Sequence, residues 1–193
     1  MSGARPGPVL AIQSQVVAGH VGLGAAAPAL AASGIETWGL PTVALSGHAA
    51  APGVQGRRVP AQEIAALGQG LQTSGRLPDL SGILTGYLGA PDAASAAAEV
   101  GEAALSAAPS ALYLCDPVLG DDGRRYLPEA VGEVLRDRLL PLAALAAPNL
   151  FELGWLTGRA VATLRDARAA AAAQRALGPR TVIVTTASPP PRR

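Results

Sequence analysis

The chain has 193 residues, 49% of them hydrophobic, and its 15 basic and 14 acidic residues leave a formal net charge of +1. This length supports one sizeable core, so we expect a single domain. The charges are scattered, which argues against nucleic acid or an anionic membrane surface as a partner. All the basic residues are arginine, which excludes the lysine of a Walker A motif and a Schiff-base lysine.

Strands and helices alternate along the chain. The apolar patterns predict the following order: strand 9–14, helix 22–33 interrupted early by Pro28, strand 36–40, helix 61–74, strand 82–85, helix 92–107 capped by Asp92, strand 111–115, helix 128–139, strand 143–147, a helix from 149, helix 163–177 and strand 181–185. Segment 42–59 lacks a helical period and is expected to form a flap or an edge hairpin. Repeated βα units with strands apolar on both faces predict a doubly wound, mostly parallel α/β sheet flanked by helices.

The single cysteine, Cys115, lies in an apolar strand and cannot form an internal disulfide, which fits a reducing compartment. The apolar run before Gln13 is too short for a secretory signal, and no apolar stretch reaches the ~18 residues of a membrane span. We therefore expect a cytoplasmic protein without a membrane segment.

Asp116 occupies the most informative position. It directly follows the apolar strand 111–115 and is itself followed by a proline and, at Gly120, a glycine turn. Ligands of open parallel sheets bind at the carboxyl ends of the strands, which favours a site at Asp116. The alternative is that the Asp-Pro pair only begins a turn.

Three other segments lie at the ends of predicted strands, and a doubly wound sheet would bring them to the same edge as Asp116. They read Gln-Ser-Gln-Val-Val over 13–17, Thr-Gly-Tyr-Leu-Gly over 85–89 and Ala-Pro-Asn-Leu-Phe-Glu-Leu over 147–153. Together with the Asp116 turn, they resemble in order and wording the pyridoxal kinases of the ribokinase-like superfamily. The resemblance extends from Val9 to Thr185.

The resemblance implies a ribokinase-like domain over residues 1–186 and a Pro/Arg-rich tail over 187–193. It implies ATP-dependent phosphorylation of the 5′-hydroxymethyl group of pyridoxal, with Mg²⁺, in a homodimer. Ser14 would hydrogen-bond the pyridine ring of the vitamin B6 vitamer, and Tyr87 would line the cleft between substrate and phosphates. Without the resemblance, Tyr87 is equally well a half-buried aromatic residue at a strand end.

On the nucleotide side, the resemblance places Asp116 beside the magnesium ion and the phosphates of ATP. Asn149 and Glu152 would order metal-bound water, and Thr185 or Thr186 would contact the nucleotide; no cluster of direct protein ligands to the metal is expected. Asn149-x-x-Glu152 also fits a capping box for its own helix, and both interpretations can hold together.

The sequence departs from the family in three ways. The family's catalytic Gly-x-Gly-Asp segment, which carries the general base, has no counterpart among the 193 residues, so we expect no catalytic residue in this chain. The ending in Pro-Pro-Pro-Arg-Arg suggests a domain that is incomplete at its C-terminus, from a truncated or frame-shifted reading. Gly47 and Ala49 stand where the family typically has Asn and Thr, and Gln15 where it commonly has His.

Alternatives remain open at this point. A hydroxymethylpyrimidine kinase of the same superfamily shares the Asp-Pro-Val turn, and a non-catalytic B6- or nucleotide-binding remnant would keep a partial cleft. Gly22-x-Gly24-x-x-Ala27 matches a loose dinucleotide pattern but does not directly follow the first strand, so close helix packing is favoured. His20 and His48 lack partners at metal-ligand spacing, and we expect both to be structural.

Overall fold

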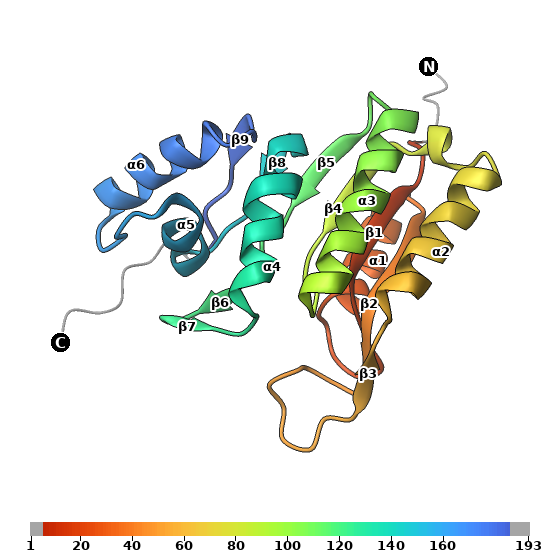
Figure 1. Ribbon diagram of the computed structural model, residues 1–193, viewed down its shortest axis with the longest axis horizontal. Coiled ribbons are helices and arrows are strands. Elements are labelled where there is room, and N and C mark those ends of the chain that lie inside the picture. Colours follow the sequence, from red (N-terminus) through yellow and green to blue (C-terminus); the bar gives the residue numbers. More distant parts are fainter. Residues whose placement is uncertain (1–5, 186–193) are drawn as a thin grey trace.

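The computed structural model describes residues 6–185. Its centre is a seven-stranded sheet in the order β3-β2-β1-β4-β5-β8-β9 (Figure 1). The strands are β1 (Val9–Val16), β2 (Thr37–Leu45), β3 (Gly56–Arg58), β4 (Gly82–Thr85), β5 (Leu112–Cys115), β8 (Leu145–Ala146) and β9 (Thr181–Val182). Every neighbouring pair is parallel except β2 and β3. The predicted doubly wound, mostly parallel α/β sheet is therefore confirmed.

Helices cover both faces of this sheet. They are α1 (Leu23–Ala32), α2 (Ala61–Thr73), α3 (Pro91–Ala107), α4 (Glu129–Val134), α5 (Leu150–Thr157) and α6 (Leu164–Arg175), and a π-helical turn at Leu135–Leu139 continues α4. In Figure 1, α2, α3 and α4 lie side by side on one face. The alternation along β2 separates the faces, because Trp38 and Leu40 pack into the main core while Gly39 adjoins Leu23 of α1. No helix within residues 6–185 is long and apolar enough to cross a bilayer.

The main core lies between the sheet and the α2–α3–α4 layer. Small side chains let these helices approach closely: a Cβ atom on Gly68 of α2 would lie 2.4 Å from Val100 of α3. In the sheet itself, Tyr113 and Cys115 are fully buried, and the Tyr113 hydroxyl shares a 2.8 Å hydrogen bond with Thr85 on the neighbouring strand. This buried bond ties Thr85, the last residue of β4, to the neighbouring strand β5.

Three local predictions are wrong. Strand β2 does not end at residue 40 but continues through Pro41 to Leu45; Pro41 is tolerated because the outer strand β3 pairs only with Val43–Leu45. Helix α1 runs through Pro28 without interruption. Asp92 does not cap α3: the N-cap is Ala90, and Asp92 lies in the first turn, where its charge faces the positive helix end.

Two hairpins project from the edge where the parallel strands end. The first joins β2 to β3 through residues 46–55 (Figure 1), which confirms the predicted edge hairpin in segment 42–59. The second, β6 (Gly120–Asp121) with β7 (Arg124–Arg125), follows the Asp116 turn and was not predicted. The two hairpins flank the region where the predicted site residues gather.

Candidate active site

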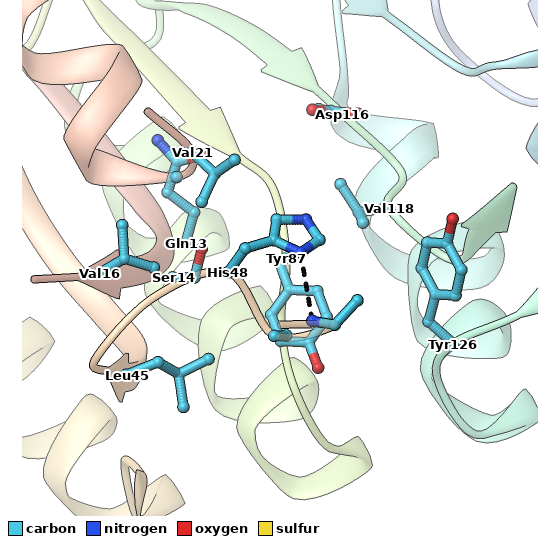
Figure 2. Close-up of a pocket in the computed structure, with 13 residues that line it drawn as sticks. Gln13, Ser14, Val16, Val21, Leu45, His48, Tyr87, Asp116, Val118 and Tyr126 are labelled. Atoms are coloured by element: carbon cyan, nitrogen blue, oxygen red, sulfur yellow. Dashed lines mark hydrogen bonds between the residues drawn. The ribbon is translucent and has the colours of Figure 1, made fainter. Parts of the chain in front are cut away.

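A cavity of about 580 Å³ opens at the carboxyl ends of β1, β2, β4 and β5. Figure 2 shows its walls, with the β1 residues on one side and Asp116, Val118 and Tyr126 on the other. The lining residues are Gln13, Ser14, Val16, Val21, Gly22, Leu45, His48, Ala49, Ala50, Tyr87, Asp116, Val118 and Tyr126. The cavity lies where the chain order of the sheet reverses, between β1 and β4, which is the usual ligand site of a doubly wound sheet.

Ser14 lies at an irregularity of β1. The pairing with β2 passes from Gln13 opposite Pro41 to Gln15 opposite Ala44, so two residues of β2 stand opposite Ser14 alone. Such bulges re-aim side chains and are frequent beside active sites. The buried Ser14 side chain thereby lines the cavity.

Gly22, at the N-cap of α1, lets the helix begin against Ser14. Its φ is +55°, and a Cβ atom there would lie 2.1 Å from the Ser14 carbonyl oxygen and 2.3 Å from its hydroxyl oxygen. Only glycine fits both the conformation and the space. This agrees with the interpretation of Gly22 and Gly24 as close-packing residues rather than a dinucleotide motif.

The backbone of Tyr87 is fixed by contacts with β2. The buried Thr42 hydroxyl donates a 2.6 Å hydrogen bond to the Tyr87 carbonyl oxygen. Two residues further on, Gly89 has a φ of +77° and lies against Val43, where a Cβ atom would be 2.8 Å from that side chain. The turn after β4 is therefore clamped to β2, and its half-buried tyrosine is directed into the cavity. Burial raises the pKa of Tyr87, and nearby Arg58 partly opposes this shift.

Asp116 faces Ser14 and Tyr87 from the other wall. Its backbone N–H donates to the Thr85 carbonyl oxygen at 2.9 Å, which continues the β4–β5 ladder by one residue. Burial raises the pKa of its carboxyl group from 3.8 to about 6. A half-buried carboxylate at the mouth of a central strand can neutralise a bound cation or accept a proton near neutral pH.

Asn149 and Glu152 form a capping box at the start of α5. The Asn149 side chain accepts from the Glu152 N–H, and one Glu152 carboxylate oxygen accepts from the Asn149 N–H, both at 2.9 Å. The other oxygen accepts from the Leu119 N–H at 3.0 Å, and Asn149 donates to the Gly120 carbonyl oxygen at 2.7 Å. These bonds fix the turn after Asp116 to α5. Neither residue belongs to the cavity lining; they lie behind it.

Glu152 is a buried carboxyl group in a strongly perturbed environment. Burial is the main reason that its pKa rises from 4.5 to about 7, and the Asp116 charge adds to the rise. The backbone N–H groups that it accepts from oppose the shift because they favour the charged form. Two carboxyl groups near the turn thus titrate close to neutral pH.

The remaining predicted residues lie away from the cavity or outside the structure. Thr185 is exposed, and its N–H donates to the Pro148 carbonyl oxygen at 2.9 Å, which places it next to the start of α5. Thr186 and the tail 187–193 lie outside the described residues. The structure therefore brings Ser14, Tyr87 and Asp116 together around one cavity.

Three polar lining residues were not predicted as site residues. His48 was expected to be structural, but it lines the cavity from the β2–β3 hairpin, and its Nδ1 accepts the Ala50 N–H at 3.2 Å (Figure 2). In the neutral ring the proton is then on Nε2, which can donate to a ligand. Tyr126 enters from the unpredicted β6–β7 hairpin, and Gln13 adjoins Ser14 in the same predicted segment.

A divalent ion would find few protein ligands here. Among residues 6–185, no three His, Cys, Asp or Glu side chains gather in a way that could hold a metal. Both Glu152 oxygens already accept backbone N–H groups, which leaves the Asp116 carboxylate as the available hard oxygen donor. One carboxylate suits Mg²⁺ that arrives with phosphate oxygens and retains its waters.

Comparison with known proteins identifies the family. A family model described as phosphomethylpyrimidine kinase matches residues 79–190, more than half of the chain. The chain belongs to this family.

Within the family, the chain is similar to pyridoxal kinases. It is 40% identical over 183 residues to the pyridoxal kinase PdxY of Granulibacter bethesdensis, covering 92% of this chain and 64% of that protein. A pyridoxal kinase from Leishmania donovani in complex with ADP and pyridoxamine superposes with a TM-score of 0.84 at 37% identity, over 95% of this chain and 63% of that one. A putative phosphomethylpyrimidine kinase from Bacteroides thetaiotaomicron gives the same TM-score at 26% identity, over 97% of this chain and 65% of that one.

These matches confirm the resemblance to pyridoxal kinases and the ribokinase-like fold that it implies. The chain spans a little under two thirds of the length of the relatives it matches.

Proposed function

We propose that this chain forms the vitamer- and phosphate-binding part of an ATP-dependent kinase that phosphorylates the 5′-hydroxymethyl group of pyridoxal. The observation that carries the proposal is the convergence of Ser14, Tyr87 and Asp116 on one cavity, in a chain 40% identical to a pyridoxal kinase. The product of this reaction is pyridoxal 5′-phosphate, and ATP supplies the transferred phosphoryl group.

In this proposal the vitamer ring lies on the β1 side of the cavity. The Ser14 hydroxyl hydrogen-bonds the pyridine ring, and the Tyr87 ring separates the vitamer from the phosphates. A flat aromatic ring suits this wall because apolar side chains surround the polar ones, among them Val16, Val21 and Leu45.

The phosphates lie on the opposite side, near Asp116. We assign the Asp116 carboxylate to Mg²⁺; when bound, the ion would neutralise charge on the phosphates. Asn149 and Glu152 hold the turn in place, and their remaining oxygen lone pairs can order water around the ion. Thr185, beside the start of α5, is assigned to the nucleotide, as is Thr186. The chemistry requires positioning and charge neutralisation more than covalent participation by these residues.

A second candidate is a hydroxymethylpyrimidine kinase; the family model is described as a phosphomethylpyrimidine kinase and the Bacteroides structure as a putative one, which keeps a pyrimidine substrate in view. A third is a binding module that holds a B6 vitamer without turnover, since no Gly-x-Gly-Asp segment occurs in the sequence. All three use the same cavity, so they differ in ligand preference and in turnover.

Calorimetric titration with pyridoxal, pyridoxine and hydroxymethylpyrimidine, run beside a coupled assay of ADP release, tests the proposal. We expect pyridoxal to bind more tightly than hydroxymethylpyrimidine. ADP release that depends on pyridoxal supports the complete reaction, and pyridoxal binding without it supports the binding module. Tighter binding of hydroxymethylpyrimidine supports the second candidate, and no binding of either compound overturns the assignment.

The assembly and compartment that we propose follow the family resemblance. We propose a homodimer, which light scattering tests. We also propose a cytoplasmic location, since the only thiol in the sequence is a buried free cysteine and requires no oxidising compartment.

A further inference from the structure

Gln13 lies in the wall of the cavity and has a buried amide nitrogen without a partner. It is only 7% exposed, and its Nε2 atom finds no hydrogen-bond partner anywhere in residues 6–185. A buried amide nitrogen without a partner costs stability, because water would have satisfied it in the unfolded chain.

The amide of Gln13 fits because the neighbouring residue, Gly86, has no side chain. Its Oε1 atom occupies space beside Gly86, where a Cβ atom would lie only 2.6 Å away. Gly86 directly precedes Tyr87, so the Gln13 carboxamide lies between the strand that carries Ser14 and the turn that carries Tyr87. Rotation about the terminal torsion of the side chain exchanges the oxygen and nitrogen atoms, so either end of the amide can be turned toward the cavity.

We propose that Gln13 is a specificity-determining residue whose carboxamide N–H group donates a hydrogen bond to an oxygen substituent of the aromatic ring bound between Ser14 and Tyr87, since Ser14 takes the ring nitrogen. The inference rests on the proposed function, because the oxygen substituents of the B6 ring supply the acceptor. An apolar side chain of the same length would serve the fold better, so the stability that Gln13 costs is explained by a partner that arrives with the ligand.

Replacement of Gln13 by methionine separates binding from stability. Methionine keeps the unbranched length of the side chain and removes both polar atoms. We expect the Kd for pyridoxal, measured by calorimetry, to rise roughly 3- to 10-fold, the effect of one lost hydrogen bond. At the same time the Tm of the ligand-free protein should rise by about 2 °C or more, because the unpaired amide is gone. Gln13→Leu serves as a second variant, for which we also expect a higher Kd for pyridoxal and a higher Tm.

The chain offers a matched control in Gln174 on α6. This glutamine is fully buried, and neither Nε2 nor Oε1 has a partner within the described part of the chain, but it does not line the cavity. Gln174→Met should raise the Tm as well while leaving the Kd for pyridoxal unchanged. The comparison shows whether loss of affinity belongs to the cavity or to any buried glutamine.

Each outcome decides the matter. Weaker pyridoxal binding in the Gln13 variants, with unchanged binding in Gln174→Met, supports the inference. Unchanged binding in the Gln13 variants, or a lower Tm in both of them, overturns the role of Gln13 and leaves the proposed function standing. If the unaltered chain does not bind pyridoxal, the proposed function fails and the inference fails with it.

Discussion

The buried carboxyl group of Glu152 should make the stability of the fold depend on pH. Its pKa is about 7 in the folded chain and 4.5 in the reference state of an exposed glutamate. Because the folded pKa is raised, the folded state favours the protonated form. The stabilising contribution is complete below pH 4.5 and is lost as the pH rises through 7. Over the interval from pH 5 to pH 8, the two values correspond to a loss of about 2.5 kcal/mol.

Glu152→Gln removes this titration and keeps the shape of the side chain. Urea unfolding of both proteins at pH 5, 6, 7 and 8, followed by tryptophan fluorescence, gives the difference in free energy of unfolding at each pH. The amide also loses one acceptor for a backbone N–H, which adds a constant offset but no slope. We expect the native chain to lose about 2.5 kcal/mol relative to the variant from the lowest to the highest pH. If the difference in free energy of unfolding between the two proteins is the same at every pH, the N–H groups of Asn149 and Leu119 fully compensate for the effect of burial on the Glu152 pKa. The reasoning would then be refuted.

Three further results are expected. Thr42→Val leaves the Tyr87 carbonyl oxygen without its hydroxyl donor, so the affinity for pyridoxal should fall about 3- to 10-fold in a calorimetric titration. Thr42→Ser keeps the hydroxyl and should restore the affinity. Equal loss in both variants would contradict the role of the hydroxyl. Gly22→Ala places a Cβ atom 2.1 Å from the Ser14 carbonyl oxygen at a φ of +55°, and should lower the free energy of unfolding by about 2 kcal/mol or more in urea melts. Asp116→Asn should weaken binding of ATP in the presence of Mg²⁺ by about 10-fold or more while changing pyridoxal affinity less than about twofold; an equal effect on both ligands would remove Asp116 from the phosphate side.

The order of strands and helices was predictable because the local patterns are strong. Strand β4 was predicted with its observed bounds, and the capping box at Asn149 was visible in the spacing of two residues. The convergence of Ser14 and Asp116 was predictable for another reason. Parallel strands end at one edge of the sheet, so residues at or just after these ends meet there; Ser14 and Asp116 do so although they are 102 positions apart.

The errors and omissions have physical causes that no local pattern contains. The second predicted strand stopped at residue 40, just before Pro41, but whether a strand can continue through a proline depends on which neighbour it has at that point. His48 and Tyr126 enter the cavity from hairpins whose path is set by tertiary contacts. The unpaired amide of Gln13 becomes apparent only when the surrounding atoms are in place, although its position next to Ser14 offered a signal.

The buried Cys115 gives the molecule a built-in reporter. It is the only thiol in the sequence, it is fully buried at the end of β5, and burial raises its pKa to about 12. In the native state the sulfur is therefore both inaccessible and protonated, and an alkylating reagent should not modify it. Modification requires the central strands of the sheet to move apart. Pulse alkylation read out by mass spectrometry, with one possible adduct per chain, would therefore measure how often these strands open and how strongly each ligand suppresses the opening.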